Sequence, residues 1–457
     1  MQIKYEDGTL IFSNVADGSP IVGLQDVIYD RRTLEYRSPA SLYRQVILEL
    51  NKHKVSKNDY ANNYKKLDLK LKKAITPRKH QTEALKAWLE SGRVGVVSLP
   101  TGAGKTILAI LAIQKVQRST LILVPTIDLL NQWHTTISSF FNVEPGRLGG
   151  GYHEIKEITV STYDSARLFI EKYGNRFAFL IADECHHLPT SQNILITKAS
   201  IAPFRLGLSA TVERTDSGEE ILYETIGPKV YEGFIQDMVS KVLSPYDVHK
   251  IEVELNKSEK EKYDQARKVY LSFLKQARVN LGHPGGWQMF LIKASQSQAG
   301  KKALEAYREQ KKTAQYAENK LHRLWEILNS HSEDSAIVFT DENALAYKIG
   351  ESFILPVITH KTKAAERKEL LDKFRSGELK VLVTSKVLNE GVDVPEASVG
   401  IVMSGSGAVR EHVQRLGRIL RHKPGKRALL YEIIAINTSE KYVHERRRQH
   451  NAYQRST

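Results

Sequence analysis

The sequence predicts an α/β protein in which two parallel-sheet domains follow each other, with a small α+β module before the first and a helical insertion before the second. Short, almost continuously apolar segments alternate with helical stretches over residues 65–240 and again over residues 334–436. Such segments are typical of strands that are buried on both faces of a parallel sheet. Over residues 257–323, which are rich in helix formers, Lys and Arg outnumber Asp and Glu by 15 to 6.

The predicted domains cover residues 1–64, 65–240, 241–328 and 329–457. In the first, Asp7-Gly8 between two alternating apolar runs predicts a β-hairpin, and the spacing of the next apolar residues predicts a helix over 41–53. The residues His-Pro-Gly-Gly at 283–286 would divide the insertion into two helical halves. The expected strands of the two sheets are 95–99, 120–124, 158–161, 177–182 and 204–209, and then 335–340, 379–384, 399–403 and 428–434.

The chain has 457 residues and a net charge of +15, which favours a polyanionic partner over a merely basic surface. Its single cysteine, Cys185, excludes an intramolecular disulfide and any site that needs several thiols, and fits a reducing compartment. The N-terminus has charges where a signal peptide needs an apolar core, and no segment reaches the roughly 18 apolar residues of a membrane span. We therefore expect a cytoplasmic, nucleoid-associated protein with no membrane partner.

Residues 99–106, LPTGAGKT, follow an apolar strand and precede a helical run, which is the setting of a phosphate-binding loop, although Leu99 replaces the first glycine of the general pattern. The two glycines allow backbone N–H groups to approach phosphate oxygens, and the next helix adds its positive end. Lys105 would contact the β- and γ-phosphates of ATP, and Thr106 would bind Mg²⁺. The loop residues expected to hold ATP are Thr101, Gly102, Ala103, Gly104, Lys105 and Thr106.

Asp183 and Glu184 follow another apolar strand. A carboxylate at a strand end that faces a phosphate loop can bind Mg²⁺ through water, and its neighbour can orient the attacking water. We therefore assign Asp183 to the metal and Glu184 to the water. The alternative is a zinc site of Cys185, His186 and His187, which is disfavoured because adjacent residues at a strand end diverge and further thiols are absent.

A second group of cations lies far along the chain, in QRLGRILR at residues 414–421. Arg415, Arg418 and Arg421 recur at every third residue, so a helix would place them along one face. Arginines of a second domain can stabilise the charge that develops on the γ-phosphate. An exposed basic helix is the alternative interpretation of the same spacing.

Seven short motifs follow one another in the order found in superfamily 2 helicases, and the chain resembles the XPB-type DNA helicases among them. They are residues 77–81, 125–133, 159–163, 209–211, 337–340, 385–397 and 414–421. The resemblance implies two RecA-like domains, an N-terminal module similar to a damage-recognition domain, and a thumb-like insertion that grips DNA. It also implies further residues at ATP, namely Arg78, Gln81 (at the adenine), Gly391 and Asp393, with Arg418 and Arg421 as arginine fingers. The residues that it implies for coupling are His186, Ser209, Thr211 and Gln414.

Contacts to one DNA strand are expected from the helicase motifs and from the insertion. The candidates are Pro125, Thr126, Thr162, Thr340 and Thr384, then Arg214 and Asp216, and in the insertion Lys268, Lys275 and Arg278. Contacts to phosphates predict salt-sensitive binding with weak sequence dependence. Aromatic residues between the cations can stack on unpaired bases; for Phe273 and Trp287 we favour the alternative, the core of a helical hairpin.

The resemblance implies a 3′–5′ DNA helicase of a short, archaeal form that uses ATP and Mg²⁺ in nucleotide excision repair or transcription. Its partners would be forked, bubble or damaged duplex DNA and a dedicated nuclease subunit. The chain departs from the family at residues 214–216, where Arg-Thr-Asp replaces Arg-Glu-Asp. This departure favours the alternative of a double-stranded DNA translocase, the motor of a nuclease complex. A binding module with a vestigial ATPase is a third hypothesis, but Lys105, Glu184 and Arg418 are all present.

Overall fold

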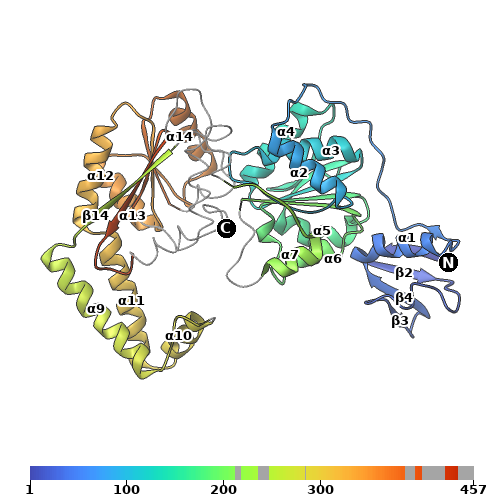
Figure 1. Cartoon of the computed structure of the whole chain (residues 1–457), viewed down its shortest axis with the longest axis horizontal. Helices are drawn as coiled ribbons and strands as arrows, with labels where there is room; N and C mark the ends of the chain where they lie inside the picture. Colours follow the sequence, from blue (N-terminus) through green and yellow to red (C-terminus); the bar gives the residue numbers. More distant parts are fainter. Residues whose placement is uncertain (211–217, 235–245, 284, 386–396, 404–427, 441–457) are drawn as a thin grey trace. The chain divides into compact units, whose positions relative to one another are not determined.

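The computed structural model describes residues 1–210, 218–234, 246–283, 285–385, 397–403 and 428–440. The chain forms two compact units; the described residues up to 234 belong to the first unit, and those from 246 onward to the second. Each unit contains a mostly parallel sheet with helices on its faces (Figure 1), so the predicted α/β class is confirmed. None of the helices in the described ranges is long and apolar enough to cross a membrane.

The N-terminal module of the first unit contains the predicted hairpin and helix. Asp7 and Gly8 take φ values of 44° and 77°, which a tight turn between antiparallel strands requires. Helix α1 buries Tyr43, Val46 and Leu50 against the sheet, whose strand order is β3-β4-β2-β1-β5. The elements are β1 (Gln2–Glu6), β2 (Thr9–Ser13), β3 (Ile28–Asp30), β4 (Glu35–Pro39), α1 (Tyr43–Lys52) and β5 (Asn58–Asp59).

The N-terminal module is joined to the larger sheet of the first unit through backbone carbonyl groups. The Tyr5 hydroxyl donates to the carbonyls of Ile170 (2.9 Å) and Ala199 (2.8 Å). The Arg44 guanidinium donates to the carbonyl of Pro203 at 2.8 Å. Because donors from two different elements of the module end on the same domain, the module is fixed in orientation as well as in place.

The larger sheet of the first unit has the strand order β13-β6-β12-β11-β7-β10-β8-β9 and contains all five predicted strands. Its pairs are parallel except for β8 with β9. The short strands β9 and β13 at the two edges, and β8 beside β9, were not predicted. Its elements are α2 (Lys79–Glu90), β6 (Val94–Ser98), α3 (Lys105–Val116), β7 (Thr120–Val124), α4 (Ile127–Phe140), β8 (Gly146–Gly149), β9 (Tyr152–His153), β10 (Ile158–Thr162), α5 (Tyr163–Tyr173), β11 (Phe179–Asp183), α6 (Ile194–Lys198), β12 (Phe204–Ser209), α7 (Gly218–Ile226) and β13 (Lys229–Glu232).

The sheet of the second unit is parallel throughout, with the order β14-β19-β18-β15-β17-β16, and contains the four predicted strands. Its elements are β14 (Tyr246–Val253), α12 (Glu318–Ser330), β15 (Ala336–Phe339), α13 (Asn343–Phe353), β16 (Val357–Ile358), α14 (Ala364–Ser376), β17 (Val381–Thr384), β18 (Val399–Val402) and β19 (Ala428–Ala435). Between β14 and α12 lie α9 (Lys257–Gln276), α10 (Gly286–Ser295) and α11 (Gln298–Gln315).

The helical insertion is shorter than the predicted range 241–328. Strand β14 pairs with β19 along all eight of its residues, and α12 buries Leu324 and Ile327 in the core of the second sheet. Both elements therefore belong to the second domain, and only α9, α10 and α11 form the insertion. Strand β14 was not predicted because it lies at an edge of the sheet. Such a strand carries charged residues, here Lys250 and Glu252, in place of an apolar run.

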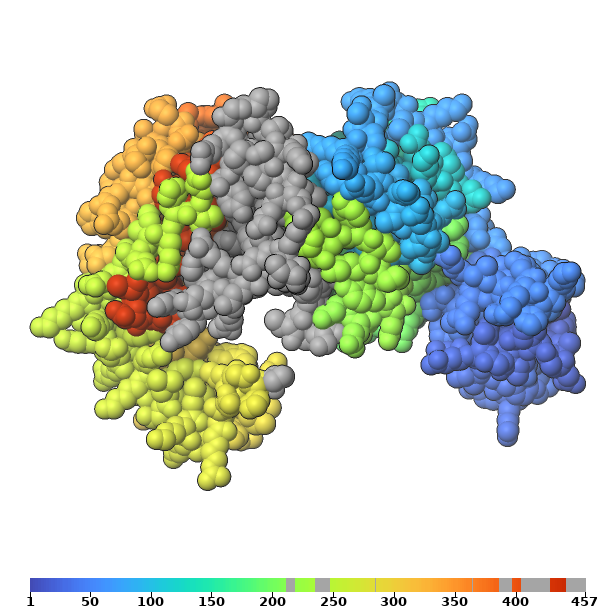
Figure 2. Space-filling model, in the orientation of Figure 1, coloured from blue at the N-terminus to red at the C-terminus, as the bar shows by residue number. Residues whose placement is uncertain are grey.

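The insertion has a small aromatic core of its own. Tyr270, Leu274 and Phe290 are buried between its helices. Phe273 packs partly buried beside them, and Trp287, 38% exposed, lies with its ring 5.2 Å from that of Phe290. The insertion therefore has three helices, one more than predicted, and it protrudes as a separate lobe (Figure 2).

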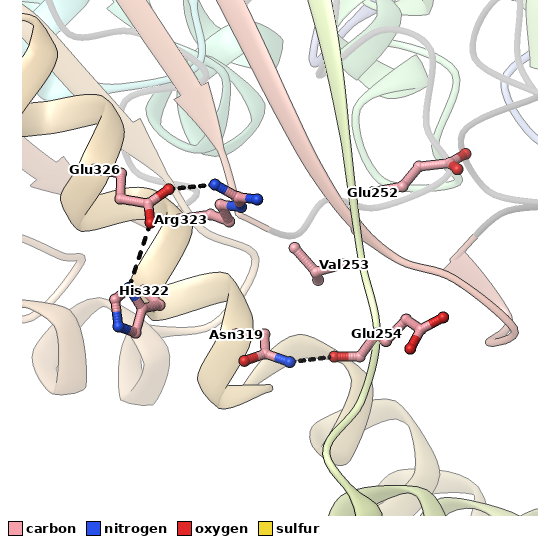
Figure 3. Close-up of a pocket in the computed structure, with 7 residues that line it drawn as sticks. All are labelled: Glu252, Val253, Glu254, Asn319, His322, Arg323 and Glu326. Atoms are coloured by element: carbon pink, nitrogen blue, oxygen red, sulfur yellow. Dashed lines mark hydrogen bonds and ion pairs between the residues drawn. The ribbon is translucent and has the colours of Figure 1, made fainter.

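The two ends of the insertion are hydrogen-bonded to each other. The side-chain amide of Asn256, just before α9, donates to the Glu318 carboxylate at 3.1 Å. The backbone N–H of Glu318 donates to Glu259 at 2.9 Å, and Asn319 donates to the carbonyl of Glu254 at 2.8 Å (Figure 3). The insertion thus leaves and re-enters the second domain at one closed base.

Helix α12 also ties together two segments near the end of the second domain. The Lys320 side chain is fully buried, and its Nζ donates to the carbonyl of Met403 (2.9 Å) and to Glu440 Oε2 (2.6 Å). The same Glu440 oxygen accepts from the backbone N–H of Ala435 at 2.9 Å. The ion pair between Lys320 and Glu440, together with the bond to Met403, therefore links α12 with residues that follow β18 and β19.

Candidate active site

The candidate site lies at the carboxyl edge of the first unit's larger sheet. Strands β6, β12 and β11 are adjacent, and their registers pair Ser209 with Ser98 and Asp183 with Leu208. The loop after β6, the Asp183–Glu184 pair after β11 and Ser209 at the end of β12 therefore meet at one edge. Ligands of open α/β sheets bind at this edge.

The phosphate loop is held from behind by α2. Gly102 and Gly104 adopt φ values of 86° and 88°, and α3 begins directly after Gly104. The Gln81 amide donates to the carbonyls of Ala103 (3.3 Å) and Gly104 (3.1 Å), and His80 Nε2 donates to Ala103 at 2.8 Å. Two buried side chains of α2 thus fix the position of the loop backbone.

Gln81 is occupied at both ends of its amide group. Its Oε1 accepts from the backbone N–H of Arg78 at 2.9 Å, and its Nε2 is bonded to the loop. If Gln81 also contacts adenine, it must do so while keeping these hydrogen bonds. The bonds themselves show that Gln81 supports the phosphate loop. His80 was not predicted, although it stands beside Gln81 in the sequence.

Gly104→Ala is expected to weaken nucleotide binding at least tenfold, because positive-φ strain costs about 1–3 kcal/mol and a new Cβ would collide with Gln81 Nε2, which is bonded to the loop. Titration of the purified variant with a fluorescent ATP analogue measures this loss. Gly151→Ala is the matched control, since Gly151 has φ 90° in the same unit but nothing within 4 Å of its Cβ position. Equal nucleotide affinities of the two variants would contradict the steric explanation.

A chain of polar contacts crosses the site from the phosphate loop to β12. Lys105 Nζ lies 3.1 Å from Glu184 Oε1, and both side chains are nearly buried. His186 Nδ1 lies 3.5 Å from Glu184 Oε2 and 3.0 Å from the Ser209 hydroxyl. Glu184 takes a left-handed backbone conformation (φ 48°), which is strained for a residue with a side chain. The structure therefore brings together four of the predicted site residues.

Asp183 is buried and receives donors from three directions. Its Oδ2 accepts from Trp133 Nε1 at 2.8 Å, its Oδ1 accepts from the backbone N–H of Glu184 at 3.1 Å, and its carbonyl accepts from the Tyr163 hydroxyl at 2.8 Å. Burial, followed by the neighbouring Glu184 charge, raises the pKa of Asp183 to about 6, while Lys105 opposes this shift. Burial therefore disfavours the ionised form of this carboxylate, whereas the Lys105 ammonium favours it.

The geometry contradicts the zinc alternative. Cys185 lies in the hydrophobic core, where a Cβ on Gly207 would meet its Sγ at 3.1 Å, and burial raises the pKa of its thiol. His186 instead turns toward Ser209. Within the ranges that the structure describes, no group of three or more His, Cys, Asp or Glu side chains could hold a metal ion.

Two helix N-termini lie at the same carboxyl edge of the sheet. Thr126 caps α4 and Thr162 caps α5, and each hydroxyl oxygen accepts the backbone N–H of the third residue of its helix at 3.3 Å. Gly149 and Gly150 pack against these helix starts, because a Cβ on Gly149 would lie 2.9 Å from the Thr162 hydroxyl, and one on Gly150 would lie 3.0 Å from Ile127. The sequence signal for this turn, three consecutive glycines at 149–151, was overlooked.

Thr340 and Thr384 do not offer their hydroxyls to an external ligand. Both are fully buried. The Thr340 hydroxyl donates to the carbonyls of Glu342 (3.0 Å) and Thr384 (3.2 Å), and that of Thr384 donates to the carbonyl of Ser385 (2.9 Å). These hydroxyls stabilise the ends of β15 and β17, and the expected hydroxyl contact to DNA is corrected accordingly.

Of the remaining candidate site residues, some lie in the described ranges and the others lie outside them. Lys268, Lys275 and Arg278 are exposed on the insertion, and Pro125 is half-buried beside Thr126. The candidates outside the described ranges are Thr211, Arg214, Asp216, Gly391, Asp393, Gln414, Arg418 and Arg421.

Three family models match separate parts of the chain. Residues 74–214 match the type III restriction enzyme, res subunit, and residues 319–423 match the helicase conserved C-terminal domain. Residues 3–61 match the xeroderma pigmentosum group B helicase damage recognition domain. Helicase domains of this kind bind nucleotide, in agreement with the site at the edge of the first sheet.

Individual relatives carry related names. The chain is 41% identical to the DNA 3′-5′ translocase XPB2 of Sulfurisphaera tokodaii, over 83% of this chain and 86% of that protein. It is 30% identical to the DNA 3′-5′ helicase XPB of Mycobacterium tuberculosis, over 76% of this chain but 58% of that protein. The crystal structure of the Pyrococcus furiosus Hef helicase domain superimposes with a TM-score of 0.54 at 18% identity over 82% of this chain and 98% of that one, which supports the fold alone.

Proposed function

The chain belongs to the XPB family of DNA helicases and translocases, and on this premise we propose that it is an ATP-dependent motor that moves along DNA with 3′–5′ polarity. The observation that carries the proposal is the contact chain Lys105–Glu184–His186–Ser209 beside Asp183. It links the phosphate loop, the acidic pair and the end of β12, which are the parts that an ATPase must coordinate.

ATP and Mg²⁺ fit the donor groups at this edge. The Thr101 hydroxyl is buried and has no hydrogen-bond partner among the described residues, as expected of a group that faces a phosphate. Thr106 and Asp183 supply the hard oxygen ligands that Mg²⁺ prefers. When bound there, Mg²⁺ would neutralise charge on the β- and γ-phosphates.

The residues of the contact chain take distinct roles in hydrolysis. Lys105 binds phosphate oxygens, which then compete with Glu184 for its ammonium group. Glu184, released in part from this pair, orients the attacking water and accepts its proton. His186 contacts both Glu184 and Ser209, so a displacement of Glu184 would be transmitted to the end of β12. Arg418 and Arg421, in the second domain, are proposed to stabilise the γ-phosphate.

DNA is proposed to lie across the starts of α4 and α5, where the helix N-termini and the exposed glycines Gly150 and Gly151 would offer backbone N–H groups to phosphates. The damage-recognition family match and the net charge of +15 support this choice of partner. We further propose, from the family resemblance, action on forked or damaged duplexes together with a nuclease subunit.

DNA is expected to stimulate ATP hydrolysis, whereas RNA without DNA is not. The stimulation by DNA should fall as the salt concentration rises. An ATPase assay with single-stranded, forked and duplex DNA, and with RNA as control, measures this response. Stimulation by RNA alone would refute the DNA assignment.

Because Thr215 replaces the acidic residue of the family, a pure translocase is the second candidate. Displacement of a triplex strand without unwinding of a 3′-tailed duplex would select it.

A further inference from the structure

We propose that Trp133 and Tyr163 are positioning residues that connect DNA-strand contact with the metal-binding carboxylate Asp183. The inference rests on the proposed function and deepens it. Both side chains are buried and come from the two helices whose N-termini are the proposed strand contacts. Both residues lie within motifs recognised in the sequence, at 125–133 and 159–163, but neither was given a role of its own.

Trp133 acts on the carboxylate itself. It lies on α4, two turns after the cap Thr126, and its indole N–H donates to Asp183 Oδ2 at 2.8 Å. The indole N–H can donate but cannot accept, so it pairs with an acceptor, here the carboxylate oxygen Asp183 Oδ2. A hydrogen bond between a fixed donor and an ionised acceptor is both strong and directional. The other oxygen, Oδ1, is held by the backbone of Glu184.

Tyr163 acts on the backbone at the same residue. It follows the cap Thr162 directly, and its hydroxyl donates to the carbonyl of Asp183 at 2.8 Å. The side chain is 4% exposed, so the contact is not shared with solvent. A shift of α5 at its N-terminus would therefore be felt at the end of β11.

The two contacts give a strand-binding event a direct physical route to the metal site. A phosphate that engages the start of α4 or α5 adjusts a rigid helix, and each helix carries one aromatic donor to Asp183. Coupling between two ligands is reciprocal, so DNA should change the affinity for metal-bound nucleotide and the reverse. The route is separate from the coupling residues implied by resemblance, which run through His186 and Ser209.

The test measures binding without turnover. For each protein, the dissociation constant of a fluorescent non-hydrolysable ATP analogue is determined in EDTA and in excess Mg²⁺, and the ratio gives the gain due to metal. In Trp133→Phe this ratio is expected to fall about tenfold, as loss of a hydrogen bond to a charged group predicts. A single-stranded oligonucleotide should raise the ratio in the parent chain, and raise it less in Trp133→Phe and Tyr163→Phe.

Matched controls separate positioning from simple loss of packing. Trp88 is 1% exposed in the same unit, and its indole N–H donates at 2.9 Å to the carbonyl of Arg205, near the start of β12 and at the opposite edge of the sheet from Asp183. Tyr43 is equally buried, and its hydroxyl donates to Asp59 in the N-terminal module. Trp88→Phe and Tyr43→Phe should lower thermal stability as much as the test variants, yet keep the metal ratio within about twofold of the parent, since neither loses a contact to the site.

Two outcomes overturn the proposal: a metal ratio in Trp133→Phe equal to that of the parent, or an oligonucleotide response that is absent in the parent or unchanged in both variants. Failure of the proposed function has a different signature. A parent chain that binds nucleotide with metal dependence but shows no DNA-stimulated hydrolysis would contradict the motor, whatever the variants do.

Discussion

Glu184→Gln is expected to lower DNA-stimulated ATP hydrolysis by about 10²- to 10⁴-fold, the usual contribution of a general base, while ATP and DNA still bind. The glutamine carbonyl can still accept from Lys105, so the contact now measured at 3.1 Å survives in the variant. What is lost is the negative charge that polarises the attacking water. Steady-state turnover, beside titrations with nucleotide and oligonucleotide, separates these two effects.

Glu157→Gln is the control for this result. Glu157 also forms a Lys–Glu pair, with Lys65 at 2.7 Å, but stands before β10, at the opposite edge of the sheet from Asp183. Its replacement should leave turnover within about twofold of the parent, as for surface changes away from a site. Undiminished turnover in Glu184→Gln would remove Glu184 from the reaction and leave the water without an assigned base.

Lys320→Met is expected to destabilise the second domain by about 3–5 kcal/mol, because it leaves Glu440 without its buried counter-charge. The Lys320 side chain is fully buried, and its ammonium also binds the Met403 carbonyl. Loss of both contacts frees the segments that follow β18 and β19. Hydrogen exchange of the amides in these strands, in the native state, measures the change in their opening free energy.

A second substitution isolates the charge effect. In Lys320→Met/Glu440→Met both charges are gone, and most of the protection from exchange should return, since an apolar pair of similar size is often as stable as a buried ion pair. Lys373→Met removes an exposed partner of Glu369 at 2.8 Å and should leave the same amides unchanged. Equal exchange in Lys320→Met and Lys373→Met would show that the buried pair contributes nothing.

The central strands could be predicted from the sequence because they are buried on both faces and therefore read as apolar runs. Thr120–Val124 and Phe204–Ser209 were predicted to the residue. Edge strands lack this signal. Strand β14 contains Asp247, Lys250 and Glu252, so its membership in the second sheet is decided by pairing with β19, which lies about 180 residues further along the chain and leaves no local pattern.

The candidate site shows the same division. Lys105 was predicted from the phosphate-loop motif that follows an apolar strand, and Asp183 and Glu184 were predicted from their place at the end of another apolar strand. Trp133 could not be identified in this way, because its contact with Asp183 depends on how α4 packs across the sheet. The expected contact between the Thr340 hydroxyl and DNA was wrong for the converse reason. The hydroxyl of a threonine at a strand end can donate to nearby carbonyls as readily as to a ligand.

The closed base of the insertion has an evolutionary consequence. Because Asn256 and Glu318 are already hydrogen-bonded, the sheet of the second domain does not depend on the chain between them to hold β14 and α12 together. A three-helix insertion bounded in this way is expected to be replaceable by a short turn without loss of the domain around it. Such an exchange would leave the candidate ATP site, which lies in the first unit, untouched.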